Sequence, residues 1–140
     1  MGGRLRPICH SLALALVATA AQAQIIPTGS PAADILLSRA VSEHRTFLTC
    51  SSLDPQTHAL ITANWQRDVT AATAILTAGN VAAEAITAFT ATAQPENLLP
   101  ASDTPYADVR QFCEAHADWQ ATYGQLNFTL LELTLPGALE

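Results

Sequence analysis

Apolar residues recur at intervals of three and four along most of the chain after residue 30, which is the spacing of one face of an α-helix. These intervals predict four helices at about 31–50, 55–78, 81–93 and 105–126, with an extension of the last toward Leu133 left open. Because the first three helices are joined by short connections, antiparallel neighbours are favoured. The sequence therefore predicts an all-α protein with a small up-down-up-down four-helix bundle.

The helix boundaries are marked by capping residues and prolines. Three helix starts carry a good N-cap residue followed by proline at the first helical position. The pairs are Ser30-Pro31, Asp54-Pro55 and Thr104-Pro105. Gly79 and Asn80 mark a break between the second and third helices, and Pro95 ends the third. We expect residues 24–30 to form a loose leader and residues 134–140 a tail.

The first 23 residues have the pattern of an export signal. Arg4 and Arg6 precede an almost wholly apolar run over 8–21, and Ala21-Gln22-Ala23 fits a cleavage site before Gln24. The run is shorter than the ~20 apolar residues that a membrane-spanning helix needs, so a retained anchor is the weaker alternative. We predict a Sec-type signal peptide (1–23) and a periplasmic or secreted single domain (31–140) with a C-terminal apolar tail. After cleavage no membrane span is expected.

The net charge of the chain limits the kinds of molecule that it can bind. The whole chain has six Arg, no Lys and 12 acidic residues, for a net charge of −6. Two of the Arg leave with the signal, so the remaining four Arg and 12 acids give the mature chain a net charge of −8. An acidic protein repels phosphate backbones and anionic lipid. We therefore expect no nucleic-acid partner.

Cleavage also leaves an even number of cysteines. Cys9 is removed, while Cys50 and Cys113 remain in an oxidising compartment, where a disulfide is the simplest outcome. A redox-active or metal-binding pair is the alternative, but the C-x-x-C spacing typical of it is absent. The prediction is a structural disulfide between these two residues.

Three histidines fall on the apolar sides of the predicted helices: His44, His58 and His116. In the register that a Cys50–Cys113 disulfide would set, their rings lie within about one helical turn of each other. Three imidazoles with an open coordination position would suit zinc or copper. The commoner alternative is a hydrogen-bonded core or boundary role for each histidine. No other cofactor is predicted.

Asp68 also projects toward the apolar side, between Ile61 and Ile75. As a functional residue it would be a carboxylate of raised pKa that acts as a general acid or base. As a structural residue it would form a buried salt bridge with an Arg of another helix or tilt to the boundary. We favour the structural interpretation, because no second carboxylate or nucleophile shares its face at a suitable spacing.

No catalytic signature occurs in the sequence: it has no P-loop, no G-x-G-x-x-G, no G-x-S-x-G and no haem-binding C-x-x-C-H. The C-terminal segment carries more large apolar residues than one helical stripe buries, and such a surplus is typical of a partner surface. These are Leu126, Phe128, Leu130, Leu131, Leu133 and Leu135. The leading hypothesis is a small exported, non-enzymatic accessory or binding protein with a protein partner on this segment. A metal-binding protein that uses the three histidines is the alternative, and the oligomeric state is left open.

Overall fold

The computed structural model describes residues 27–126 and 130–140, and no helix in these ranges is both long enough and apolar enough to cross a membrane. The predicted signal peptide lies outside the described residues. The bounds of the seven helices within the described residues are α1 Pro31–Ser51, α2 Pro55–Ala78, α3 Ala83–Thr92, α4 Pro95–Leu98, α5 Tyr106–Ala115, α6 Trp119–Gly124 and α7 Leu131–Ala138. The prediction of an all-helical protein is confirmed for this part of the chain.

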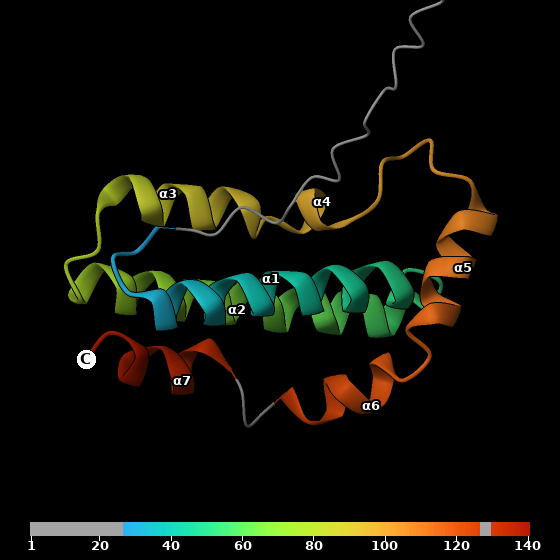
Figure 1. Ribbon diagram of the computed structural model, residues 1–140. Coiled ribbons are helices and arrows are strands. Elements are labelled where there is room, and N and C mark those ends of the chain that lie inside the picture. The colour runs from blue at the N-terminus through green and yellow to red at the C-terminus, as the bar shows by residue number, and fades with distance from the viewer. Residues whose placement is uncertain (1–26, 127–129) are drawn as a thin grey trace, which may run out of the picture.

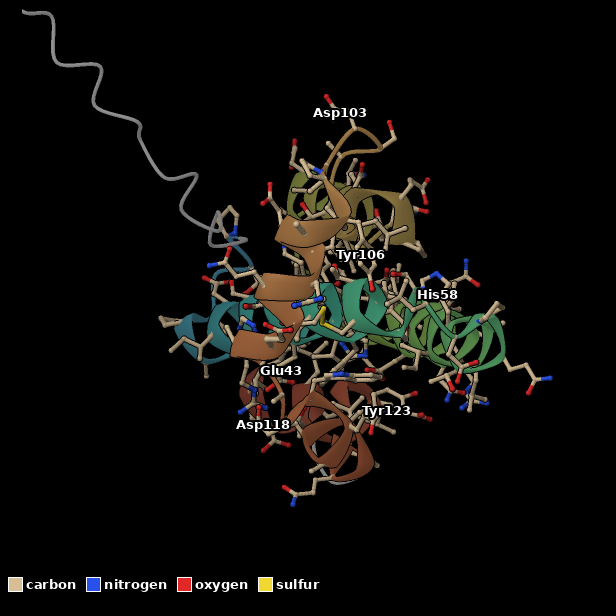
Figure 2. All side chains as sticks on the ribbon, turned by 90° about the vertical axis from the view of Figure 1, so that its right-hand side faces the viewer. Glu43, His58, Asp103, Tyr106, Asp118 and Tyr123 are labelled. Atoms are coloured by element: carbon tan, nitrogen blue, oxygen red, sulfur yellow. A yellow bond between two sulfur atoms is a disulfide. The ribbon has the colours of Figure 1, made fainter. Side chains whose placement is uncertain are left out.

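The helices form three layers around a central hairpin (Figure 1). The long helices α1 and α2 run antiparallel in the middle layer, with α3 and α4 on one side and α6 and α7 on the other. Helix α5 crosses the end of the hairpin and carries the chain from the first outer layer to the second (Figure 2). Both α1 and α2 contact α7, while α3 packs on α2 and α4 on α1.

The two long helices begin where their caps predict. The side chain of Ser30 accepts a hydrogen bond from the Ala33 amide, and that of Asp54 accepts from the amides of Gln56 and Thr57. A proline follows each cap, where its fixed φ suits the first helical turn and its missing N–H costs no helical hydrogen bond. Local sequence therefore determines the start of both helices in the hairpin.

The predicted fourth helix over 105–126 is not found as one element. Helix α5 ends at Ala115, and the backbone of His116 leaves helical geometry at φ −118° and ψ 42°. The Cys50–Cys113 disulfide is confirmed, with a Cα–Cα distance of 5.5 Å. Because this bond holds α5 across the end of α1, the chain must turn before α6 runs back along the hairpin. Trp119 then packs against the core.

The described part of the expected leader and the expected tail are more ordered than the sequence predicts. Thr28, in the leader, donates from its amide and its hydroxyl to the Asp34 carboxylate at 2.8 and 2.7 Å. Ser30 donates its hydroxyl to the carbonyl of Ala138, which joins the start of α1 to the end of α7. The expected tail forms most of α7, and its Leu135 is fully buried. These segments belong to the folded domain.

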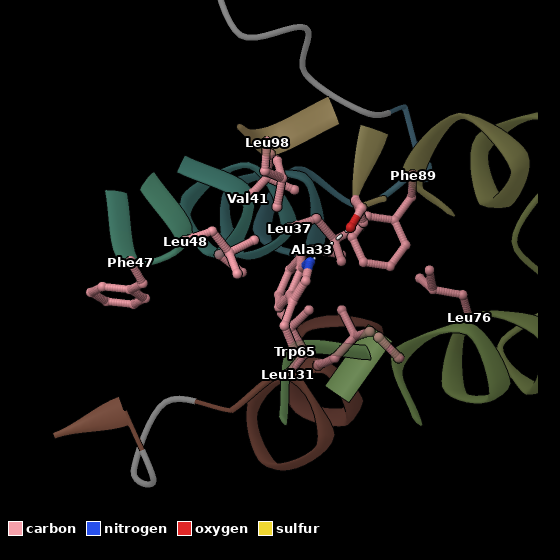
Figure 3. Close-up of a cluster of buried hydrophobic side chains, with 14 of the residues drawn as sticks. Ala33, Leu37, Val41, Phe47, Leu48, Trp65, Leu76, Phe89, Leu98 and Leu131 are labelled. Carbon is pink, nitrogen blue, oxygen red and sulfur yellow. Dashed lines mark hydrogen bonds between the residues drawn. The ribbon is translucent and has the colours of Figure 1, made fainter. Parts of the chain in front are cut away.

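Trp65 lies at the centre of the core (Figure 3). Its side chain is fully buried, and its indole N–H donates to the Ala93 carbonyl at 2.7 Å. Apolar residues of all three layers surround it; the fully buried large ones besides Trp65 are Leu37, Phe47, Leu48, Ile61, Leu76, Phe89, Leu98, Leu131 and Leu135. Burial of one such side chain contributes about 1.5–3 kcal/mol.

We expect the double variant Cys50→Ala/Cys113→Ala to lose about 4 kcal/mol of unfolding free energy, because the disulfide closes a long loop in the unfolded chain. The sequence separation of its cysteines is 63 residues. Urea denaturation of oxidised wild type and variant measures the difference. A loss below about 1 kcal/mol would contradict a structural role for the disulfide.

Candidate functional site

A cavity of about 230 Å³ opens between the hairpin and the C-terminal layer. We term it the His44 cleft. It is lined by His44, Asn64, Arg67, Asp68, Tyr123, Gly124, Leu126, Leu130 and Glu132. Ligand pockets for drug-sized molecules are about 300–1,000 Å³, so a cleft of this size suits a smaller molecule. Polar side chains of α1, α2, α6 and α7 converge on it.

His44 is the most deeply buried of these polar groups, with 2% of its surface exposed. Its Nδ1 lies 2.8 Å from the Ala40 carbonyl. A carbonyl only accepts hydrogen bonds, so Nδ1 carries the proton and Nε2 has a free lone pair in the neutral ring. Within the described residues, no hydrogen bond to Nε2 occurs. Nε2 itself is not fully enclosed, because among the described residues the one fully buried side-chain polar atom without a hydrogen bond is Ser38 Oγ.

Aromatic contacts hold the His44 ring and keep it uncharged. The ring stacks on Trp65, with centroids 3.9 Å apart, and meets the edge of Phe47 at 5.2 Å. Desolvation by this burial lowers the pKa of His44 to about 4, while the bond to Ala40 opposes the shift. At neutral pH the cleft therefore contains a neutral imidazole.

A chain of hydrogen bonds crosses the cleft from α2 to α6. Arg67 donates from Nη2 to Asn64 Oδ1 at 3.0 Å, and Asn64 donates from Nδ2 to the Tyr123 hydroxyl oxygen at 3.0 Å. The Tyr123 hydroxyl thus accepts from Asn64 and keeps its own proton to donate. Its ring meets the edge of Phe47 at 5.2 Å, which fixes its position between the hairpin and α6 (Figure 2).

Asp68 has a structural role that the sequence does not predict. Its side chain is buried, and its carboxylate accepts the amide N–H groups of Leu131 and Glu132, each at 3.1 Å. These are the first amides of α7, whose N-cap residue, Leu130, offers no side-chain acceptor. Asp68 therefore caps a helix that begins 63 residues later, a role different from the salt bridge or boundary position considered from the sequence.

Opposing effects act on the Asp68 carboxyl group. Burial raises its pKa, and the nearby charge of Glu132 acts in the same direction. The two α7 amides and the charge of Arg67 lower the pKa. Because both oxygens already accept a backbone N–H, the carboxylate is held in place as a helix cap.

The structure does not assemble the predicted three-histidine site. His58 is half-buried at the start of α2, with Nδ1 3.0 Å from the Ser51 hydroxyl oxygen. His116 is exposed beyond the end of α5, where Nδ1 lies 2.8 Å from the Phe112 carbonyl. Across residues 27–126 and 130–140, no group of three or more His, Cys, Asp or Glu is arranged to hold a metal ion. Zinc or copper binding stays a prediction that the described geometry does not support.

Comparison with known proteins finds no matching family model, no matching curated protein and no matching solved structure. Function must therefore be inferred from the cleft itself.

We expect Asp68→Ala to lower the unfolding free energy by about 2–4 kcal/mol, because a buried and a partly buried amide at the start of α7 lose their acceptor. Hydrogen exchange at Leu131 and Glu132 should accelerate more than exchange elsewhere in the core. Asp118→Ala is a matched control, since Asp118 occupies the N-cap position of α6 without making a side-chain cap bond. Equal effects of the two substitutions would contradict the capping role of Asp68.

The lowered pKa of His44 predicts an acid-dependent loss of stability. The folded-state pKa of about 4 lies below the ordinary value of 6.5, so neutral His44 favours folding above pH ~6.5 and this contribution is lost as the pH falls toward 4. Between pH 7.5 and 5, wild type should lose about 2 kcal/mol more than His44→Phe, which keeps an aromatic ring but cannot titrate. Urea denaturation at both pH values measures this, and parallel losses would contradict the buried neutral state.

Proposed function

We propose that this protein is a small exported, non-enzymatic binding protein that holds a small hydrogen-bonding ligand in the His44 cleft. The observation that carries the proposal is the lone pair of His44 Nε2, which belongs to a buried neutral ring on the cleft wall and has no partner among the described residues. A neutral imidazole nitrogen without a proton accepts a hydrogen bond, so a ligand N–H or O–H in the cleft would donate to Nε2.

The other cleft residues define the complementary ligand. Tyr123 retains a hydroxyl proton to donate, so the ligand should carry an oxygen acceptor as well as a donor for His44. Arg67 and Glu132 are both exposed and bring opposite charges to the wall, which favours a ligand without net charge. A small polyol or a small amide has this combination of groups.

A binding role agrees better with the cleft than catalysis does. The described cleft lining contains no serine, threonine, cysteine or lysine that would act as a nucleophile. The two oxygens of Asp68 are occupied by the α7 amides. The neutral state of His44 at ordinary pH would suit a general base, but the lining that the structure describes places no serine, threonine or cysteine beside it to activate.

Two features support the exported location that forms part of this proposal. The signal pattern over residues 1–23 has the positive, apolar and small-residue regions in the required order. The Cys50–Cys113 disulfide is typical of an oxidising compartment such as the periplasm or the cell exterior.

Fewer apolar side chains of the C-terminal segment are exposed than the sequence suggests. The case for a protein partner on this segment is therefore weaker. Leu131 and Leu135 are buried in the core, and Leu126 and Leu130 are half-buried. Leu133 remains 64% exposed, while Phe128 lies outside the described residues. Most of the leucine surplus therefore packs inside the domain. A partner that docks on this segment stays a secondary proposal.

The proposal predicts binding that depends on His44. We would titrate the ¹⁵N-labelled mature domain with glycerol, glucose and acetamide and follow the amides of Asn64, Tyr123 and Gly124 by NMR. At least one probe should shift these signals in wild type. The affinity should fall about tenfold or more in His44→Phe, since a neutral hydrogen-bond acceptor of about 1–1.5 kcal/mol is removed.

His116→Phe is the matched control, because His116 is exposed and does not line the cleft. It should bind as wild type does. No cleft shift with any probe, or equal binding by His44→Phe and wild type, would contradict the proposal.

A further inference from the structure

A second cavity, of about 280 Å³, lies between α1, α4 and α5. We term it the α1–α5 pocket, and it shares no lining residue with the His44 cleft. Four apolar side chains form most of its surface: Leu98, Pro100, Val109 and Phe112. Leu98 is fully buried, and Val109 and Phe112 are half-buried on α5. The volume is close to the lower end of the range for ligand pockets.

Two opposite charges line the same pocket without neutralising each other. Arg45 comes from α1 and Asp108 from the first turn of α5. Within the described part of the chain the salt bridges join other residues, Arg39 to Glu43 and Arg110 to Glu114. The guanidinium of Arg45 and the carboxylate of Asp108 therefore remain available to a ligand that lies between the two helices.

We propose that the α1–α5 pocket binds a free amino acid with an apolar side chain. Its carboxylate would pair with Arg45, whose planar guanidinium matches carboxylate geometry in a bidentate contact. Its ammonium group would pair with Asp108, and its side chain would pack against Leu98, Val109 and Phe112. A zwitterion with an apolar body matches all three features of the pocket, whereas a simple anion or cation satisfies only one charge.

The disulfide gives this pocket its walls. Thr49 and Phe112 both line the pocket and directly adjoin Cys50 and Cys113 in the sequence. The bond holds α5 against the end of α1 where the two helices cross (Figure 2). The backbone positions from which Arg45 and Asp108 extend are therefore set before any ligand arrives, which reduces the entropic cost of binding.

The test is calorimetric or NMR titration of the oxidised mature domain with L-leucine. Three analogues each lack one matched feature: 4-methylpentanoate has no ammonium, 3-methylbutylamine has no carboxylate, and glycine has no apolar side chain. We expect leucine to bind at millimolar concentration or below, with shifts at Val109 and Phe112. Each analogue should bind about tenfold more weakly or worse, since a charge pair or the apolar contact is lost.

Variants show whether leucine binds in this pocket or elsewhere on the domain. Arg45→Gln and Asp108→Asn should each weaken leucine binding about tenfold, while both retain the fold because the two side chains are exposed. Arg110→Gln, on the same helix but outside the pocket, and His44→Phe should bind leucine normally. No leucine binding in the millimolar range, equal binding of glycine and leucine, or full binding by Arg45→Gln would overturn the inference.

Discussion

The burial of Trp65 is the constraint on which the rest of the structure depends. The side chain projects from α2 to the point where the three layers meet, and it contacts each of them. His44 of α1 stacks on its ring, its N–H is bonded to Ala93 at the end of α3, and Leu131 of α7 belongs to the same buried cluster. The contacts that stabilise the core also desolvate His44 and keep its ring neutral. The chemical character of the cleft therefore follows from core packing.

Besides the Ser30–Ala138 and Asn64–Tyr123 hydrogen bonds, two further long-range links hold the C-terminal third of the chain against this core. The Cys50–Cys113 disulfide attaches α5 to the end of α1, and the Asp68 carboxylate caps α7 from α2. Each link also defines a cavity: the disulfide sets the walls of the α1–α5 pocket, and Asp68 positions the segment that closes the His44 cleft.

The central hairpin was predictable because its signals are local. Capping residues followed by proline define the starts of α1 and α2, and regular apolar spacing defines their buried faces, including the inward position of His44. The break after Ala115 was not predictable in this way. Apolar spacing continues through Trp119 and Tyr123, and no glycine or proline marks the turn. The turn lies directly after the tertiary link at Cys113, which local sequence does not reveal. The expected convergence of His44, His58 and His116 assumed a long fourth helix antiparallel to α1, and with α5 crossing the end of the hairpin no such three-ligand group is found among the described residues.

Asp68 is a second case in which the local sequence does not predict a tertiary contact. Its inward orientation followed from helical periodicity, but its partner did not, because the amides that it caps belong to a segment expected to be a tail. Pro136 and Gly137 near the end of that segment resemble a helix stop. The segment nevertheless forms most of α7. A side chain that caps a distant helix leaves no mark in local sequence.

The most direct measurement of the central claim is an NMR titration of the His44 ring nitrogens. We predict that at pH 7 Nδ1 carries the proton and Nε2 does not, and that the ring titrates with a pKa of about 4. A proton on Nε2 at pH 7, or a pKa at or above the ordinary value of about 6.5, would contradict the buried neutral state of this histidine.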